Sequence, residues 1–190
     1  MEWALLTALH THQSEIFSPM NDTGPQIARQ NVLKYPAILL ATWFGSGLLP
    51  KAPGTWGTLA ALPFAWALQT SFSWMILALA TVLVFFIGIW ASNGYVARVG
   101  GEDPGAVVID EVAGIWLTLV PAAYLSPYAP DLMTYAVAFV LFRLADIFKP
   151  WPASWADKNI HGGAGIMLDD IIAAVFSAIG LTLYLVYLGG

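Results

Sequence analysis

Long apolar blocks separated by short polar links dominate the chain after Lys34. The blocks cover residues 36–49, 57–69, 73–97, 112–127, 132–149 and 171–188. A helix that spans a membrane needs about 20 apolar residues, with a range of roughly 17–25. The blocks 73–97 and 171–188 reach this length alone, the two blocks between them come close to it, and 57–69 needs residues from its flanks. The pattern therefore predicts an all-α, polytopic membrane bundle of about five membrane helices.

The N-terminal part of the chain differs from the rest. The first apolar block, in PAILLATWFGSGLLP, is short, contains glycines and is bounded by prolines, so we expect a re-entrant or interfacial segment there. Residues 1–34 are polar and lack the basic start and apolar core of a secretory signal. We expect a poorly ordered cytoplasmic tail over 1–34 and one membrane-embedded domain over 35–190.

Composition supports the membrane prediction and excludes several functions. Hydrophobic residues make up 58% of the 190 residues and charged residues only 10%, whereas a soluble domain carries roughly 25% charged residues. The chain has no cysteine, which excludes disulfides, thiolate metal sites and a cysteine nucleophile. The net charge of −5 argues against a nucleic acid partner, and no feature indicates a homo-oligomer.

The basic residues predict how the bundle is oriented. The links at 70–73 and 126–131 contain no Lys or Arg. The alternate links and helix ends contain Lys51, Arg98, Arg143, Lys149 and Lys158. Basic residues favour the cytoplasmic side of a membrane. This orientation places three polar motifs together on the cytoplasmic face.

The first polar motif is GSGLLPKAPGTWGTLAALP, residues 45–63. Gly54, Thr55 and Thr58 open an apolar helix just after Lys51. The free N–H groups and the dipole of a helix N-terminus attract anions, so this segment is a candidate phosphate site. A threonine-capped helix entry with turn glycines explains the same residues without a ligand.

The second motif, GGEDPGAVVIDEVAGIWLTL, places Asp110 and Glu111 at a helix start. The third motif ends in a similar acidic pair, Asp169 and Asp170, at the edge of the last apolar block. Adjacent residues lie about 100° apart around a helix, so we expect one member of each pair to face the bundle interior. A preference of acidic residues for helix N-termini also explains Asp110 and Glu111.

The third motif, FRLADIFKPWPASWADKNIHGGAGIMLDD, carries further charged residues. Arg143, Asp146 and Lys149 recur at i, i+3 and i+6 on one broad helix face near the cytoplasmic end. An Arg–Asp pair three residues apart is often only a local salt bridge. His161 lies alone in a glycine-rich loop, where an ordinary loop residue is the simpler interpretation.

Taken together, the motifs bring acids and bases to one face. A set of oxygen ligands without cysteine favours Mg²⁺. The candidate metal ligands are Asp110, Glu111, Asp146, Asp169 and Asp170. The cations Lys51, Arg143 and Lys149 suit a phosphate group, and the combination indicates phosphoryl chemistry on a lipid. The alternative is a transporter or channel with an acidic cation path, but its carboxylates would lie inside the apolar blocks rather than at their edges.

The chain resembles the phosphatidylglycerophosphatase A family. The resemblance rests on FGSGLLPKAPGTWGTLAALP, VVIDEVAGIWLTL and FVLFRLADIFKPWPASWADKNIHGGAGIMLDDIIAAV and covers roughly residues 40–176. It implies Mg²⁺-dependent removal of the terminal phosphate of phosphatidylglycerophosphate, giving phosphatidylglycerol. It also implies action at the cytoplasmic face of the bacterial inner membrane. CDP-alcohol phosphotransferases also use acidic residues and Mg²⁺, but their D-G-x-x-A-R pattern is absent from this sequence.

Two mechanisms fit these residues. In one, Mg²⁺ held by Asp110 and Asp169, with Asp146 or Glu111, activates a water for attack on phosphorus. In the other, an aspartate attacks and forms an aspartyl-phosphate. In both, Lys51, Arg143 and the helix start at Gly54–Thr58 stabilise the negative charge of the transition state. We favour the water route, because there are more carboxylates than one nucleophile requires.

Overall fold

The computed structural model describes residues 24–101, 103–126 and 131–188. Over these residues the protein is helical and has no β-strand, which confirms the predicted all-α class. Its short N-terminal elements are α2 (Gly24–Asn31), α3 (Pro36–Ala41) and the 3₁₀ turn η1 (Ser46–Leu48). The elements that follow are α4 (Pro53–Ser71), α5 (Trp74–Val99), α6 (Ile109–Leu125), α7 (Leu132–Phe148), α8 (Ala153–Asn159) and α9 (Gly162–Tyr187).

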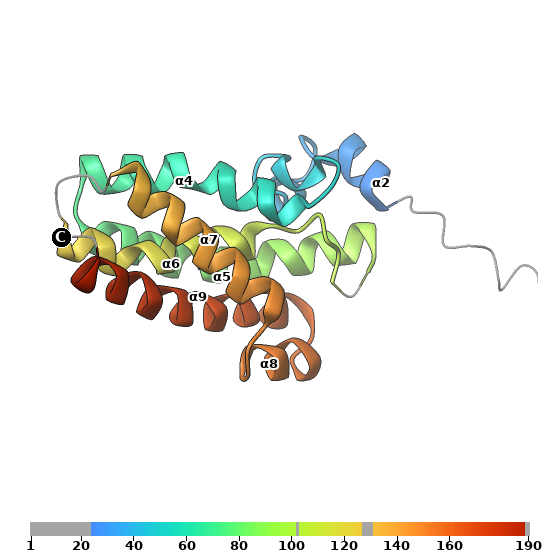
Figure 1. Ribbon diagram of the computed structural model, residues 1–190. Coiled ribbons are helices and arrows are strands. Elements are labelled where there is room, and N and C mark those ends of the chain that lie inside the picture. Colours follow the sequence, from blue (N-terminus) through green and yellow to red (C-terminus); the bar gives the residue numbers. More distant parts are fainter. Residues whose placement is uncertain (1–23, 102, 127–130, 189–190) are drawn as a thin grey trace, which may run out of the picture.

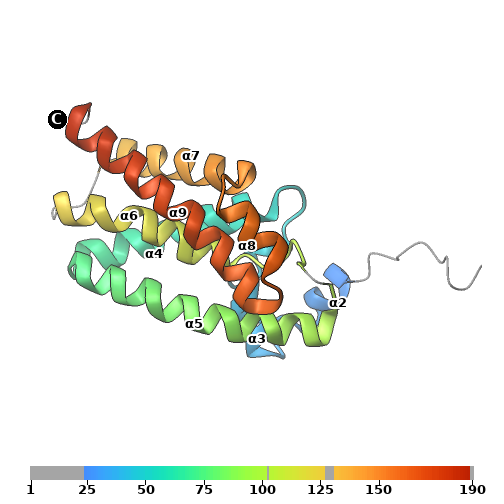
Figure 2. The same cartoon turned by 90° about the horizontal axis from the view of Figure 1, so that it is seen from below.

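Helix α6 is the central element of the bundle. It packs against α4, α5, α7 and α9, which surround it in Figures 1 and 2. Eleven of its 17 residues are buried, so little of its surface is left for the surroundings. At Gly114 the helix comes so close to α7 that an added Cβ would lie 2.4 Å from the ring of Phe142. The acidic first turn of α6 is therefore held in the middle of the molecule.

The long helices run alternately up and down. Helices α4, α6 and α9 begin at the end of the bundle where α5 and α7 finish, on the right in Figure 1. We call this end, which also carries α2 and α8, the site end. Sequence signals explain two of the boundaries. Pro53 starts α4, and the Asp131 side chain accepts a hydrogen bond from the Thr134 N–H of α7 at 2.7 Å.

Two of the described helices, α5 and α9, are long and apolar enough to cross a membrane. Each has 26 residues, and their mean hydropathies are 2.4 and 1.9. At about 1.5 Å per residue each extends about 39 Å, more than the ~30 Å hydrocarbon core of a bilayer. Large apolar side chains such as Leu83, Phe86 and Trp90 point outward from α5. The structure thus supports two of the predicted spans, and a total of about five stays a prediction.

The first apolar block does not form a spanning helix, as its glycines and prolines predicted. It forms α3, a left-handed turn at Trp43 and Phe44, and then η1. Helix α3 packs closely on α5, because a Cβ at Gly94 would lie 2.6 Å from the Cβ of Ala37. The segment therefore belongs to the folded bundle at its site end.

The polar N-terminal region differs in part from the prediction. Residues 24–31 fold as α2, so a poorly ordered tail up to residue 34 is wrong for this stretch. Ala28 is fully buried, and Arg29 Nη2 donates a hydrogen bond to the Leu48 carbonyl oxygen at 2.7 Å. Helix α2 forms because these contacts with the rest of the chain stabilise a segment too short to be helical alone. Residues 1–23 of the predicted tail lie outside the described residues.

Candidate active site

Three carboxylates meet at the site end, between α6 and α9. Asp110 and Glu111 lie in the first turn of α6, and Asp170 lies in the third turn of α9. One oxygen of each side chain lies within 4.8 Å of the corresponding oxygens of the other two. We call Asp110, Glu111 and Asp170 the acidic trio. Both Asp110 and Glu111 take part, so the expectation that only one of them faces inward is wrong. Since α6 begins at Ile109, no helical turn precedes Asp110 and Glu111, and both side chains can reach toward α9.

Several carboxylate oxygens around the trio are buried without a hydrogen-bond partner. They are Asp110 Oδ1, Glu111 Oε2, Asp169 Oδ1 and Asp170 Oδ2. A buried charge without a partner is costly, and a bound cation removes that cost. Mg²⁺ prefers carboxylate oxygens, and the trio offers three of them within 4.8 Å of one another. The donor set and its unpaired oxygens therefore fit a hard divalent cation.

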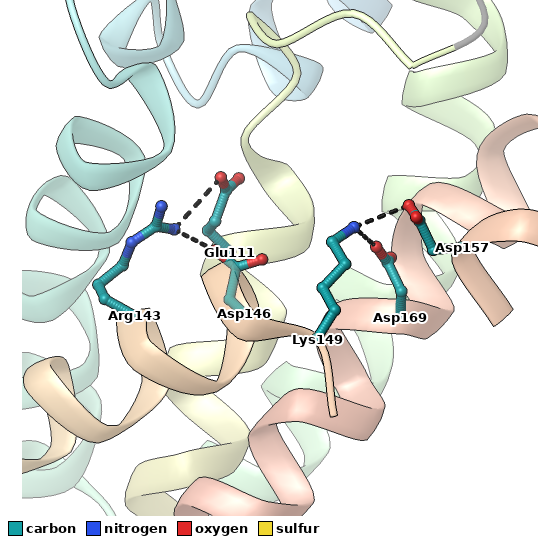
Figure 3. Close-up of polar contacts among 6 residues, drawn as sticks. All are labelled: Glu111, Arg143, Asp146, Lys149, Asp157 and Asp169. Carbon is teal, nitrogen blue, oxygen red and sulfur yellow. Dashed lines mark hydrogen bonds and ion pairs between the residues drawn. The ribbon is translucent and has the colours of Figure 1, made fainter. Parts of the chain in front are cut away.

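Arg143 of α7 lies beside the trio and balances part of its charge. Its Nη1 atom is 3.5 Å from Glu111 Oε1 and 2.7 Å from Asp146 Oδ2, as Figure 3 shows. The local Arg–Asp pair is thus present, but the same guanidinium also reaches α6. Its Nε atom is buried and has no hydrogen-bond partner. Arg143 therefore retains a donor for an anion.

Gly54 brings the start of α4 into contact with these charges. A Cβ at Gly54 would lie 2.0 Å from Glu111 Oε1 and 3.0 Å from Arg143 Nη1, so no side chain fits there. The N-cap residue Ala52 provides no side-chain cap. A helix N-terminus has N–H groups without intrahelical partners and a positive dipole end, which suit a phosphate. The structure therefore places a candidate anion site next to the trio.

The other residues of the predicted phosphate site lie differently. Thr58 is fully buried, and its hydroxyl donates to the Gly54 carbonyl oxygen at 2.8 Å, so it braces α4 internally. Thr55 is half-buried one residue beyond Gly54. Lys51 is exposed, with a left-handed φ of 59°. The structure thus brings Gly54 and Arg143 to the trio and leaves Thr58 in a supporting position.

Lys149 forms a second charged group that joins α7, α8 and α9. Its ammonium donates hydrogen bonds to Asp157 Oδ1 at 2.8 Å and to Asp169 Oδ2, as Figure 3 shows. Lys149 and Asp169, both predicted as site residues, are therefore paired with each other. The partner in α8, Asp157, was not singled out from the sequence. It lies eight residues beyond Lys149, after two prolines, where no helical spacing indicates the pairing.

Burial and neighbouring charges shift the pKa values of Lys149 and Asp103 at the site end. Burial alone would lower the pKa of Lys149, but hydrogen bonds and charge from Asp157 and Asp169 outweigh it and raise the pKa above its usual value. Burial raises the pKa of Asp103, and the nearby Lys149 offsets this in part. Lys149 is therefore a permanent positive charge at neutral pH.

A cavity of about 400 Å³ with both charged and apolar lining residues opens beside this group. Its lining includes Asp103, Lys158 and His161 together with Asp169. His161 is the N-cap residue of α9, as a loop residue would be. Asn93 of α5, another residue that the sequence did not indicate, accepts a hydrogen bond from the Gly163 N–H at 2.8 Å. This bond fixes the start of α9 and with it the position of the aspartates that follow.

Comparison with known proteins identifies the family of this chain. A sequence profile described as Phosphatidylglycerophosphatase A matches residues 39–185. The chain is also 45% identical to Phosphatidylglycerophosphatase A of Escherichia coli over 143 residues, which are 75% of this chain and 80% of that protein. The chain belongs to the phosphatidylglycerophosphatase A family. All the charged residues described above, from Lys51 to Asp170, lie within the matched range.

Two further relatives match this chain over a similar length. Phosphatidylglycerophosphatase A of Haemophilus influenzae is 38% identical over 144 residues, which are 76% of this chain and 85% of that protein. A Bacteroides thetaiotaomicron protein with the provisional name phosphatidylinositol-3-phosphatase is 40% identical, over 75% of this chain and 89% of that protein. No solved structure matches the chain.

Family membership confirms the resemblance drawn from the three motifs. It makes the protein a phosphatase and gives no support to the alternative of a transporter or channel. The positions of the charged side chains are compatible with that activity, because metal-type ligands and an unpaired arginine donor lie together.

Proposed function

We propose that the protein hydrolyses the terminal phosphate of phosphatidylglycerophosphate and releases phosphatidylglycerol and phosphate. The observation that carries this proposal is the acidic trio facing Arg143 and the N-terminus of α4. The names of the Escherichia coli and Haemophilus influenzae relatives support the same substrate. The name of the Bacteroides relative indicates a phosphoinositide instead, so the substrate must be tested directly.

We place the protein in the bacterial inner membrane with its site end at the cytoplasmic face. Helices α4, α5, α6, α7 and α9 would be the five spans, although α6 and α7 have only 17 residues. Their ~26 Å length falls slightly short of the hydrocarbon core, which suits helices surrounded by protein or thinned lipid. Basic residues at the site end, such as Lys51 and Lys158, support this orientation.

We also propose that Mg²⁺ is the cofactor, held by Asp110, Glu111 and Asp170. The buried, unpaired oxygens of these side chains support the assignment. Asp169 and Asp146 were predicted as ligands as well, but each makes a close ion pair in the structure and neither is within 4.8 Å of all members of the trio, whereas Glu111 pairs with Arg143 only at 3.5 Å and keeps Oε2 unpaired. They are therefore better placed to orient the site. When bound, Mg²⁺ would supply positive charge that stabilises the transferring phosphoryl group.

The residues of the chain support a specific course for the reaction. Arg143 and the Gly54 N–H at the start of α4 would bind the phosphate and stabilise its charge in the transition state, since Pro53 has no N–H and those of Thr55 and Trp56 donate to the Ala52 carbonyl oxygen. In the water route, Asp110 accepts a proton from a water that attacks phosphorus, the bond to the glycerol oxygen breaks, and that oxygen takes up a proton. In the other route an aspartate oxygen forms the bond to phosphorus first, and water then hydrolyses the aspartyl-phosphate.

The substrate assignment is tested by phosphate release from defined lipids in detergent micelles. We expect the purified protein to release phosphate from phosphatidylglycerophosphate much faster than from phosphatidylinositol 3-phosphate or phosphatidic acid. A preference for phosphatidylinositol 3-phosphate would move the protein to the activity that the Bacteroides name indicates. No release from any of the three by folded protein would contradict a lipid phosphatase.

The metal assignment has a test that does not depend on activity. A ligand that binds only the folded state raises its stability according to its concentration and affinity. We expect Mg²⁺ to raise the unfolding temperature of the detergent-solubilised wild type and to have little effect on Asp170→Asn. Asp131→Asn is the matched control, since Asn caps a helix as well as Asp and Asp131 lies at the other end of α7. An equal Mg²⁺ effect in all three proteins would contradict a site at the trio.

A further inference from the structure

An open cavity of about 410 Å³ lies between α4 and α7, and its lining is mainly apolar. The lining residues are Leu59, Leu62, Pro63, Trp66, Leu132 and Tyr135. We call this the α4–α7 groove. At its far end Tyr135 donates a hydrogen bond to Gln69 Oε1 at 3.2 Å, which joins the two helices there.

The spacing of residues along both helices leads from this cavity toward the active site. On α4, Thr55, Leu59, Leu62 and Trp66 follow one another at intervals of four, three and four residues. Such residues share one edge of a helix. The edge therefore runs from the apolar cavity to Thr55, directly after Gly54.

The matching edge of α7 ends at the arginine. Leu132, Tyr135, Phe139 and Arg143 follow one another at intervals of three, four and four residues. Arg143 pairs with Glu111 and lies next to Gly54. The edges of α4 and α7 therefore lead to the same charged residues. The two edges are thus apolar beside the cavity and lead to Thr55 and to Arg143, whose Nε atom is buried and has no hydrogen-bond partner.

We infer that this groove binds one acyl chain of the lipid substrate while the phosphate of that lipid binds at Arg143. The inference rests on the proposed function. The substrate lipid matches this arrangement, because its negatively charged phosphate is followed by a hydrocarbon chain. The apolar stretch from Leu59 to Trp66 is about 10 Å long at 1.5 Å per residue. This length lies within the ~15 Å that one leaflet contributes to the hydrocarbon core.

Two other apolar cavities lie away from Arg143. One, of about 330 Å³, lies between α6 and α9, and the other, of about 360 Å³, is lined mainly by α5 together with Leu117 and Ile171. Toward the site end α5 and α9 pack tightly against each other. A Cβ at Gly88 of α5 would lie only 2.4 Å from Met167 Sδ of α9. Figure 2 shows the two helices approaching each other at that end and separating along their length. A chain bound between α5 and α9 would be cut off from the acidic trio.

A bulky substitution in the groove tests the inference. Leu59 is 40% exposed, so Leu59→Trp fills the groove without displacing the core. We expect kcat/KM for long-chain phosphatidylglycerophosphate to fall about tenfold, as for the loss of roughly two buried CH₂ contacts. A water-soluble analogue with very short acyl chains should lose less than about threefold. The control is Ile179→Trp, a similar change at a 55% exposed residue of the cavity between α6 and α9.

The outcomes separate the groove from the function. Equal losses on both substrates, no loss on the long-chain lipid, or the same loss in Ile179→Trp would overturn the groove. Failure of the wild type to release phosphate from either substrate would overturn the proposed function instead. For that case a phosphatidylglycerophosphate with a photoreactive acyl chain gives a readout without turnover. We expect crosslinks on α4 and α7 that Leu59→Trp reduces, and crosslinks on α5 and α9 would contradict the groove.

Discussion

Gly54 determines how closely the first turn of α4 can approach the charged side chains. Its missing Cβ leaves the space that Glu111 Oε1 and Arg143 Nη1 occupy. The sequence indicated Gly54 as a place where a phosphate could approach the backbone. The structure adds a second reason for glycine, namely that the protein's own carboxylate and guanidinium come equally close.

Gly54→Ala should therefore impair catalysis more than folding. The added methyl group must displace Glu111 or Arg143, and displacement of a catalytic group by about 1 Å can cost roughly a hundredfold in rate. We expect a loss of that order in kcat/KM for phosphate release. Gly180→Ala in α9 is the control, because its Cβ would lie 3.4 Å from Leu141 Cδ1, an ordinary contact. Similar activities for the two variants would show that the α4 approach does not matter.

The two adjacent aspartates of α9, Asp169 and Asp170, contact different neighbours. Their position at the edge of an apolar block indicated a functional pair. Which of them joins Asp110 and Glu111 depends on the rotation of α9, and residues about 100° apart then reach different neighbours. Asp170 faces Asp110 and Glu111, whereas Asp169 pairs with Lys149. That rotation is set by close packing, such as Gly88 against Met167, which no local pattern contains.

At the scale of elements, Lys149 holds three helices together. It follows the last residue of α7 and bonds to Asp157 of α8 and to Asp169 of α9. The Asp169 side chain is only 7% exposed, so its charge depends on this partner. The sequence predicted Lys149 as a phosphate ligand, because helical spacing placed it beside Arg143. Helical spacing could not predict the pairing with Asp157 and Asp169, because it depends on the turn that brings α8 back over α9.

This arrangement predicts a non-additive pair of substitutions. Lys149→Met leaves the buried Asp169 carboxylate without its cation, which should cost about 1–3 kcal/mol of folding free energy. Adding Asp169→Asn removes the unpaired charge and should restore part of the loss. Thermal unfolding of the two single variants and the double variant in detergent measures the coupling. If the double variant is destabilised by the sum of the single losses, Lys149 is not the partner on which Asp169 depends.

For the whole molecule, the separation of apolar blocks from charged links along the sequence predicted most of the architecture. Apolar blocks became α4, α5, α6, α7 and α9, and the polar links between them gathered the charged motifs at one end, as expected. Helix α2 escaped prediction because its stability comes from contacts of Ala28 and Arg29 with distant residues. Close packing around Gly54 and Gly114 likewise depends on which helices become neighbours.

The orientation in the membrane can be tested with single cysteines, since the chain has none of its own. Ser71, at the end of α4, and Lys158, in α8, are exposed at opposite ends of the bundle. We expect a membrane-impermeant maleimide to label Ser71→Cys in spheroplasts and Lys158→Cys only after lysis. Labelling of Lys158→Cys from outside would reverse the orientation. Labelling of both from one side would contradict a spanning bundle.

Phosphate release with and without Mg²⁺ can show whether the acidic trio is a Mg²⁺-dependent phosphatase site. Phosphate release from phosphatidylglycerophosphate is followed for wild type, Asp170→Asn and Asp131→Asn, with Mg²⁺ and then with a chelator. We expect wild type and Asp131→Asn to lose activity on chelation and regain it with Mg²⁺. Asp170→Asn, folded to the same extent, should release roughly a hundredfold less or worse. Release by the wild type that survives chelation, or full activity in Asp170→Asn, would contradict the account.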